Sequence, residues 1–109
     1  GLVPQANRYD VTAGRLLTVG AFGLGSSAGQ DVANLNDVNL PTMIGSVAPA
    51  TVAGTLPELT GSKDGLLHIN ISNTISCQIY FSTHSSSPVY YRRSVSAASW
   101  EPWSRIVIE

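Results

Sequence analysis

The stretch that decides the fold runs from Gly65 to Phe81 and reads GLLHINISNTISCQIYF in this 109-residue chain. Apolar residues occupy every second position on both sides of a polar centre, Ser72-Asn73-Thr74. Period-two alternation of β-branched and aromatic residues predicts two half-buried strands. A three-residue connection places Ile71 opposite Ile75 and keeps both apolar rows on one face of the hairpin, with Asn73 or Thr74 in the left-handed conformation. The same register pairs, further from the turn, Ile69 with Cys77 and Leu67 with Ile79.

A third strand is predicted after the polar loop 82–88, with Val89 opposite Phe81. The apolar face would then continue through Tyr91 and Val95. This register places Arg93 on the same, inward face. Because a buried unpaired guanidinium is costly, we expect a bulge, an open edge or an acidic partner near Arg93.

A fourth strand, Trp103 to Ile108, would complete an antiparallel sheet of about four strands. Upstream of the hairpin, residues 42–47 predict a short strand, and the rest of residues 30–61 predicts turns and loops because of its Pro and Gly residues. Residues 1–30 are interrupted by glycines at 20, 23 and 25 and predict a short extended segment, a shaft or collar whose backbone lies close to another chain. The expected fold is mainly β: a small antiparallel β-meander domain, residues 31–109, behind that segment.

Composition excludes several classes of function. The formal net charge is −1 and the basic residues are scattered, so no patch would neutralise the phosphates of a nucleic acid. Charged residues make up only 12% of the chain, which suits a neutral polar surface or one that a partner covers. No apolar run is long enough to cross a membrane. Cys77 is the single cysteine, which excludes an internal disulfide and favours burial as a small apolar side chain.

Catalytic chemistry is not indicated. The seven carboxylates are isolated along the sequence, which is typical of turns and solvated charges. His68 and His84 have no neighbouring cluster of metal ligands, and His68 is expected on an exposed strand face. No nucleophile elbow or phosphate-binding loop is present. We therefore expect no enzyme activity, no metal and no cofactor.

Aromatic residues concentrate in the last thirty positions, beside amide and guanidinium groups. Rings of this kind stack on the apolar face of a sugar while neighbouring polar groups bond its hydroxyls. A trimer interface is an equally good interpretation of Tyr80, Tyr90 and Arg92, and Trp103 is expected to fill the core or an interface. The candidate ligand-binding residues are Tyr80, Tyr90, Arg92, Gln78, His68 and Trp100.

The motifs, taken in order, resemble a known family. Residues 9–25 (YDVTAGRLLTVGAFGLG) resemble the segment before the terminal domain of many phage and prophage tail fibres. The turn at residues 34–38 (NLNDV) is similar to the start of the knob-type domain of R-type pyocin fibres. Further on, residues 78–81 resemble the first long strand pair of that domain, and residues 89–106 resemble its ending. Two regions depart from the family pattern: the turn at residues 94–99, and residues 44–60.

This resemblance implies an intertwined homotrimer at the end of a fibre, in a virion or a bacteriocin assembled in the host cytoplasm. It implies attachment to a bacterial surface polysaccharide, lipopolysaccharide or capsule, without bond cleavage. A trimerising collar with recognition elsewhere in the fibre is one alternative. Part of a glycan-degrading tailspike is another, which would need paired carboxylates from neighbouring chains.

Overall fold

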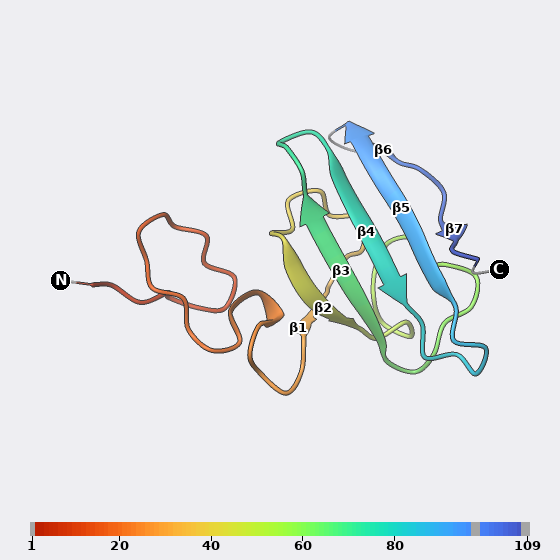
Figure 1. Cartoon of the computed structure of the whole chain (residues 1–109), viewed down its shortest axis with the longest axis horizontal. Helices are drawn as coiled ribbons and strands as arrows, with labels where there is room; N and C mark the ends of the chain where they lie inside the picture. The colour runs from red at the N-terminus through yellow and green to blue at the C-terminus, as the bar shows by residue number, and fades with distance from the viewer. Residues whose placement is uncertain (1, 97–98, 108–109) are drawn as a thin grey trace.

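The computed structural model describes residues 2–96 and 99–107, which form one mainly β domain and a protruding N-terminal segment (Figure 1). One sheet has the strand order β1-β2-β3-β4-β5-β6, and β7 also pairs with β5. Strands β2 to β7 pair antiparallel, whereas β1 runs parallel to β2. The elements are η1 (Ala21–Gly23), β1 (Gln30–Asp31), β2 (Met43–Val47), β3 (Asp64–Asn70), β4 (Ser76–Phe81), β5 (Val89–Ser96), β6 (Ser99–Trp100) and β7 (Ser104–Arg105).

The register predicted from the alternation is confirmed. Leu67 pairs with Ile79, Ile69 pairs with Cys77, and Val89 pairs with Phe81. The Ile71 N–H donates to the Ile75 carbonyl over 2.9 Å, which leaves a three-residue connection. The left-handed conformation expected at Asn73 or Thr74 is wrong, because the non-glycine residues with positive φ in the described chain are Phe22 and Ser87.

The C-terminal segment forms two short strands where the sequence predicted one longer strand. In place of one strand over residues 103–108, the two-residue strands β6 and β7 both pair with β5, near its end and its beginning. Ile108, the predicted end of the fourth strand, lies outside the described residues. The predicted short strand at residues 42–47 is confirmed as β2.

The prediction of which face is buried is wrong. The inner face of the sheet, which packs against the loops of residues 32–59, carries the residues expected in solvent. The outer face, which the described chain leaves uncovered, carries the apolar row expected in the core. Inner-face residues include Met43, Leu66, His68, Gln78, Tyr80, Tyr90 and Arg92, and outer-face residues include Ile44, Leu67, Ile69, Cys77, Ile79, Phe81, Val89, Tyr91, Arg93 and Val95.

Loop residues and strand residues share the core. Val32 and Leu35 from the loops pack with Leu66, Tyr80 and Tyr90 from the strands. Partly buried residues of the loops and of the C-terminal segment close this cluster, among them Val52, Leu56, Leu59 and Trp103. Trp103, expected in the core or an interface, is partly buried and packs against this core. These loops cover only the inner face of the sheet. The core therefore forms without the apolar residues of the outer face.

Arg93 lies on the outer face, opposite Cys77, in the predicted register but in solvent. Its Nε donates to Glu101 Oε1 over 3.0 Å, so the expected acidic partner is present. The bulge expected near Arg92 and Arg93 does not interrupt the pairing of β5 with β4, and a register shift occurs instead between Ser94 and Ser96, where β5 pairs with β6. Both charged side chains are about half exposed, so this ion pair stabilises the fold only slightly.

Residues 2–29, called the arm below, extend away from the sheet on the side of β1 and β2 (Figure 1). The arm contains η1 and an isolated bridge between Pro4 and Leu16, so it is extended with one short helical turn. Gly23 fixes its approach to β2: φ is +80°, and a Cβ would collide with the carbonyl oxygen of Ile44. Only glycine combines that conformation with so close a backbone contact.

Candidate functional site

A cleft of about 460 Å³ opens beside β6, where the C-terminal segment meets two loops. Arg92 forms part of its wall from β5, and Trp100 from β6. The loops contribute Asn36 and Thr55, whose side chains and backbone bond each other over 3.2 to 3.3 Å. Indole, amide, hydroxyl and guanidinium groups therefore meet in one hollow. The lining residues are Asn36, Thr55, Arg92, Ser99, Trp100, Glu101 and Pro102.

Two tryptophans hold the wall of the cleft together. The Arg92 guanidinium lies between their rings, 4.4 Å from the centroid of Trp100 and 4.3 Å from that of Trp103. The Trp100 indole N–H donates to the Asn36 carbonyl over 3.1 Å, and the Trp103 indole N–H donates to the Thr55 carbonyl over 2.8 Å. A cation between two aromatic faces is favourable when it is shielded from water. The stack thereby attaches both loops and the C-terminal segment to β5.

Arg92 is only 2% exposed, and no carboxylate among the described residues forms an ion pair with it. Its Nε donates to Gln78 Oε1 and its Nη2 donates to the Leu35 carbonyl, both over 2.9 Å. Burial lowers the pKa of Arg92 to about 10, which still leaves the side chain cationic at neutral pH. The positive charge is therefore balanced by two indole faces and two neutral oxygen acceptors.

The polar groups behind the cleft form a continuous hydrogen-bond chain. Gln78 Nε2 donates to the Leu35 carbonyl over 2.9 Å and lies 3.1 Å from His68 Nδ1. His68 Nε2 lies 2.9 Å from Asn70 Oδ1. These contacts fit a neutral His68 that donates from Nε2 and accepts at Nδ1. These side chains are therefore buried with their polar groups hydrogen-bonded, whereas Gln30 Oε1 is buried among the described residues without a hydrogen-bond partner.

The candidate ligand-binding residues divide into two groups. Arg92 and Trp100 line the cleft. Tyr80, Tyr90, Gln78 and His68 are buried on the inner face, and their polar groups bond inside the protein. The expectation that they lie on an exposed polar face is wrong, because the loops cover that face. Tyr80 bonds Asp64, and the Tyr90 hydroxyl accepts from the Leu59 N–H.

Sequence reasoning missed the other half of the cleft. Asn36 lies in the recognised turn at residues 34–37, and Glu101 and Pro102 lie between the two tryptophans. No periodicity links these positions to Thr55, because loops have no repeating register. Glu101, expected to be a solvated charge, is indeed exposed, but it also lines the cleft. The cleft becomes apparent only in the structure, where the two tryptophans bond the loops that carry Asn36 and Thr55.

Within the described residues, no group of three or more His, Cys, Asp or Glu side chains could hold a metal ion. His68 is fully buried rather than exposed, and its two ring nitrogens are engaged by Asn70 and Gln78. The cleft residues are suited to hydrogen bonding and stacking with a neutral polar ligand.

Comparison with protein-family models, with curated proteins and with solved structures finds no match for this chain. None of the helices in residues 2–96 and 99–107 has the length and apolar character needed to cross a membrane.

Neutrality of His68 leads to a pH-dependent stability. Burial lowers the pKa of His68, and the Arg92 charge lowers it further, against opposing effects of the Asn70 hydrogen bond and the Asp37 charge. The unfolded chain therefore binds a proton near pH 6.5 more readily than the folded chain does. As pH falls from 7.5 to 5.5, the free energy of unfolding should decrease, with a slope of at most about 1.4 kcal/mol per pH unit. Urea denaturation at fixed protein concentration measures this slope.

The His68→Gln variant should lose most of this pH dependence, even if it is less stable at pH 7.5. The matched control is His84→Gln, because His84 lies in the 82–88 loop and, among the described residues, its imidazole bonds the side chain and the N–H of Ser86. That variant should keep the slope of the unmodified protein. An equal slope in all three proteins would contradict the buried, neutral state of His68.

Proposed function

We propose that this chain is the receptor-binding tip of a phage-type tail fibre, which attaches a virion or bacteriocin to a bacterial surface glycan without cleaving it. The observation that carries the proposal is the cleft beside β6. It combines an indole ring at Trp100 with hydroxyl and amide groups at Ser99, Thr55 and Asn36. Sugars require this combination, because each ring has an apolar face and a rim of hydroxyl groups.

Two further features support attachment in preference to other roles. The chain has a formal net charge of −1, and the cleft contains one cationic and one acidic side chain, Arg92 and Glu101. This balance suits a neutral or weakly charged saccharide better than a polyanion. The cleft is also open to solvent at its exposed lining residues, so a single site is expected to give weak affinity. Several copies on one fibre end would reach useful strength by avidity.

The collar alternative has its own support, because the arm and the outer face both expose apolar side chains. A collar needs apolar surfaces for trimerisation but no ligand-binding cleft. A receptor-binding tip needs the apolar surfaces and the cleft. The two functions therefore differ in whether blocking the cleft removes binding to bacteria.

A Ser99→Tyr variant tests the proposal, because Ser99 is an exposed lining residue and a phenol ring would fill the hollow. Binding to an array of bacterial lipopolysaccharide and capsule polysaccharides should fall at least tenfold relative to the unmodified protein. The matched control is Ser85→Tyr, because Ser85 is also exposed and lies in the loop that precedes β5, whereas β6 pairs with the end of β5. It should bind normally, and circular dichroism should show all three proteins folded.

Unchanged binding by Ser99→Tyr would exclude this cleft as the receptor site. Absence of binding to every polysaccharide and to intact bacteria would favour the collar. Release of shorter saccharides from the array polysaccharides would contradict attachment without cleavage.

A further inference from the structure

The outer face of the sheet has the composition of a protein core. Across four strands, one row of paired residues runs from Ile44 through Leu67 and Ile79 to Tyr91. A neighbouring row contains Ile69 and Cys77 and ends at Arg93. The Arg93 charge is neutralised by Glu101. A face with this pattern is normally covered, because antiparallel sheets alternate apolar and polar residues when one side meets water.

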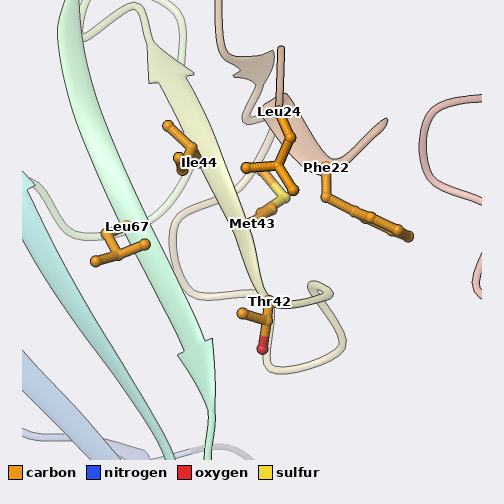
Figure 2. Close-up of a pocket in the computed structure, with 6 residues that line it drawn as sticks. All are labelled: Phe22, Leu24, Thr42, Met43, Ile44 and Leu67. Atoms are coloured by element: carbon orange, nitrogen blue, oxygen red, sulfur yellow. The ribbon is translucent and has the colours of Figure 1, made fainter. Parts of the chain in front are cut away.

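The apolar surface continues from the sheet to the arm. A hollow of about 210 Å³ lies between η1 and the edge of the outer face (Figure 2). Phe22 and Leu24 reach it from the arm, while Ile44 and Leu67 reach it from β2 and β3. The outer rows and this hollow together form one apolar surface from β5 to the arm.

The exposed area is large for a protein of this size. Six outer-face and hairpin side chains keep 38% to 64% of their surface: Ile44, Ile71, Ile75, Phe81, Tyr91 and Val95. With roughly 150 to 250 Å² for a large side chain, they leave about 500 Å² of apolar surface open. Few monomeric proteins expose a single patch above a few hundred Å².

The arm has the same property. Seven of its large apolar side chains keep 45% to 82% of their surface: Leu2, Val3, Val11, Leu16, Leu17, Val19 and Leu24. By the same measure they add roughly 800 Å², which brings the total to about 1,300 Å² per copy. A standard-size interface needs about 800 Å² from each partner. The chain therefore carries enough apolar surface to form a stable interface with its own copies.

We propose that the outer face of β2 to β5 and the arm are covered by further copies of this chain. Within one chain, the apolar arm does not cover the apolar sheet face. A second copy supplies both surfaces, so the arm or the sheet face of one copy can cover that of another. That the face is an interface follows from its geometry, whereas a stoichiometry of three rests on the proposed function. The polar cleft beside β6 borders this surface at Glu101, which pairs with Arg93, and the rest of its lining stays available to a ligand.

Ile79→Lys is the principal test, since Ile79 lies at the centre of the four-strand row and its side chain points away from the inner core. Light scattering of the unmodified protein should give a multiple of 11.5 kDa, and the variant should give a single 11.5 kDa chain with the circular dichroism of a β protein. The conservative control is Ile79→Val, which should keep the mass of the unmodified protein. A folded Ile79→Lys variant that keeps the mass of the assembly would overturn the proposal.

Cys77 gives a second measurement that does not depend on a variant. It is the single thiol of the chain and lies on the outer face, half-buried in one copy. In the assembly, its reaction with a thiol reagent should be at least tenfold slower than in the folded Ile79→Lys monomer. If that variant fails to fold, the comparison is with the unmodified protein diluted until it dissociates. Equal rates in the assembled and dissociated forms would place the interface elsewhere.

The outcomes separate this proposal from the proposed function. An unmodified protein that is monomeric at high concentration overturns the interface, even if it binds polysaccharide. A dimer supports the interface and counts against a threefold fibre end. An assembly that fails to bind any polysaccharide supports the interface and rejects the receptor-binding tip.

Discussion

Replacing Arg92 with alanine is expected to lower the free energy of unfolding by about 3 to 5 kcal/mol, because two buried acceptors lose a charged donor and a large buried side chain is removed. The substitution removes the cation between Trp100 and Trp103 and leaves two acceptors, Gln78 Oε1 and the Leu35 carbonyl, each with one donor fewer. It also opens a cavity between the indoles, which adds to the cost. Urea denaturation at fixed protein concentration, followed by tryptophan fluorescence, measures the change.

The next residue in the sequence is the matched control. Arg93 has the same side chain on the same strand, but it faces solvent and forms an exposed pair with Glu101. Arg93→Ala should change the free energy of unfolding by less than about 1 kcal/mol. Arg92→Lys keeps the charge but loses the planar group that stacks between the rings, so it should remain clearly destabilised. Similar losses from Arg92→Ala and Arg93→Ala would contradict the stacked arrangement.

Replacing Asp64 with alanine should lower the free energy of unfolding by about 3 kcal/mol or more, because several buried donors lose a charged acceptor together. The carboxylate is 4% exposed and accepts from the Tyr80 hydroxyl, from the Thr83 N–H and hydroxyl, and from the Gly61 N–H. It therefore connects β3 and β4 to the loop that precedes β3 and the loop that follows β4. The matched control is Asp31→Ala, whose carboxylate is exposed and lies 3.9 Å from Lys63, with an expected change below about 0.5 kcal/mol.

Asp64 also predicts acid sensitivity. Burial alone would raise its pKa, but the hydrogen bonds from Tyr80, Thr83 and Gly61 outweigh burial and lower the pKa below the ordinary value of 3.8. The stabilisation is complete above the pKa of the unfolded chain and is lost as pH falls through the lower pKa of the folded protein. Between pH 5 and pH 2, the unmodified protein should lose more stability than Asp64→Ala does. Parallel curves over that range would show that Asp64 is not bonded in this way.

Alternation in the sequence determined the strands and their register, because both depend on local parity. The pairing of Ile69 with Cys77 follows from the parity of the three-residue turn, whereas the pairing of Val89 with Phe81 was assumed as the register that continues the apolar face. Which face is buried does not follow from parity, and there the prediction was wrong. We predicted from their hydrophobicity that Leu67 and Ile79 lie in the core of the chain. Hydrophobicity does not distinguish a residue buried in the core of one chain from a residue that a partner would cover.

The polar inner face could not be recognised because its stability comes from partners distant in sequence. Gln78 bonds Leu35 across 43 positions, and Arg92 bonds the same carbonyl across 57. Taken singly, these side chains are typical of an exposed strand face. The cleft is similar: Trp100 and Arg92 were recognisable by residue type, whereas Asn36 and Thr55 are brought there by loops without periodicity.

The two short strands β6 and β7 on the free side of β5 affect how copies of the chain can join. A long uncovered strand edge accepts further strands without limit, which is the route to fibrils. Here one border of the sheet is β1, two residues long, and the other is formed by β6 and β7, also two residues each. Growth by adding strand to strand is therefore suppressed at both borders. The proposed contact between outer faces would instead end once each face is covered, provided that the copies close a symmetric arrangement.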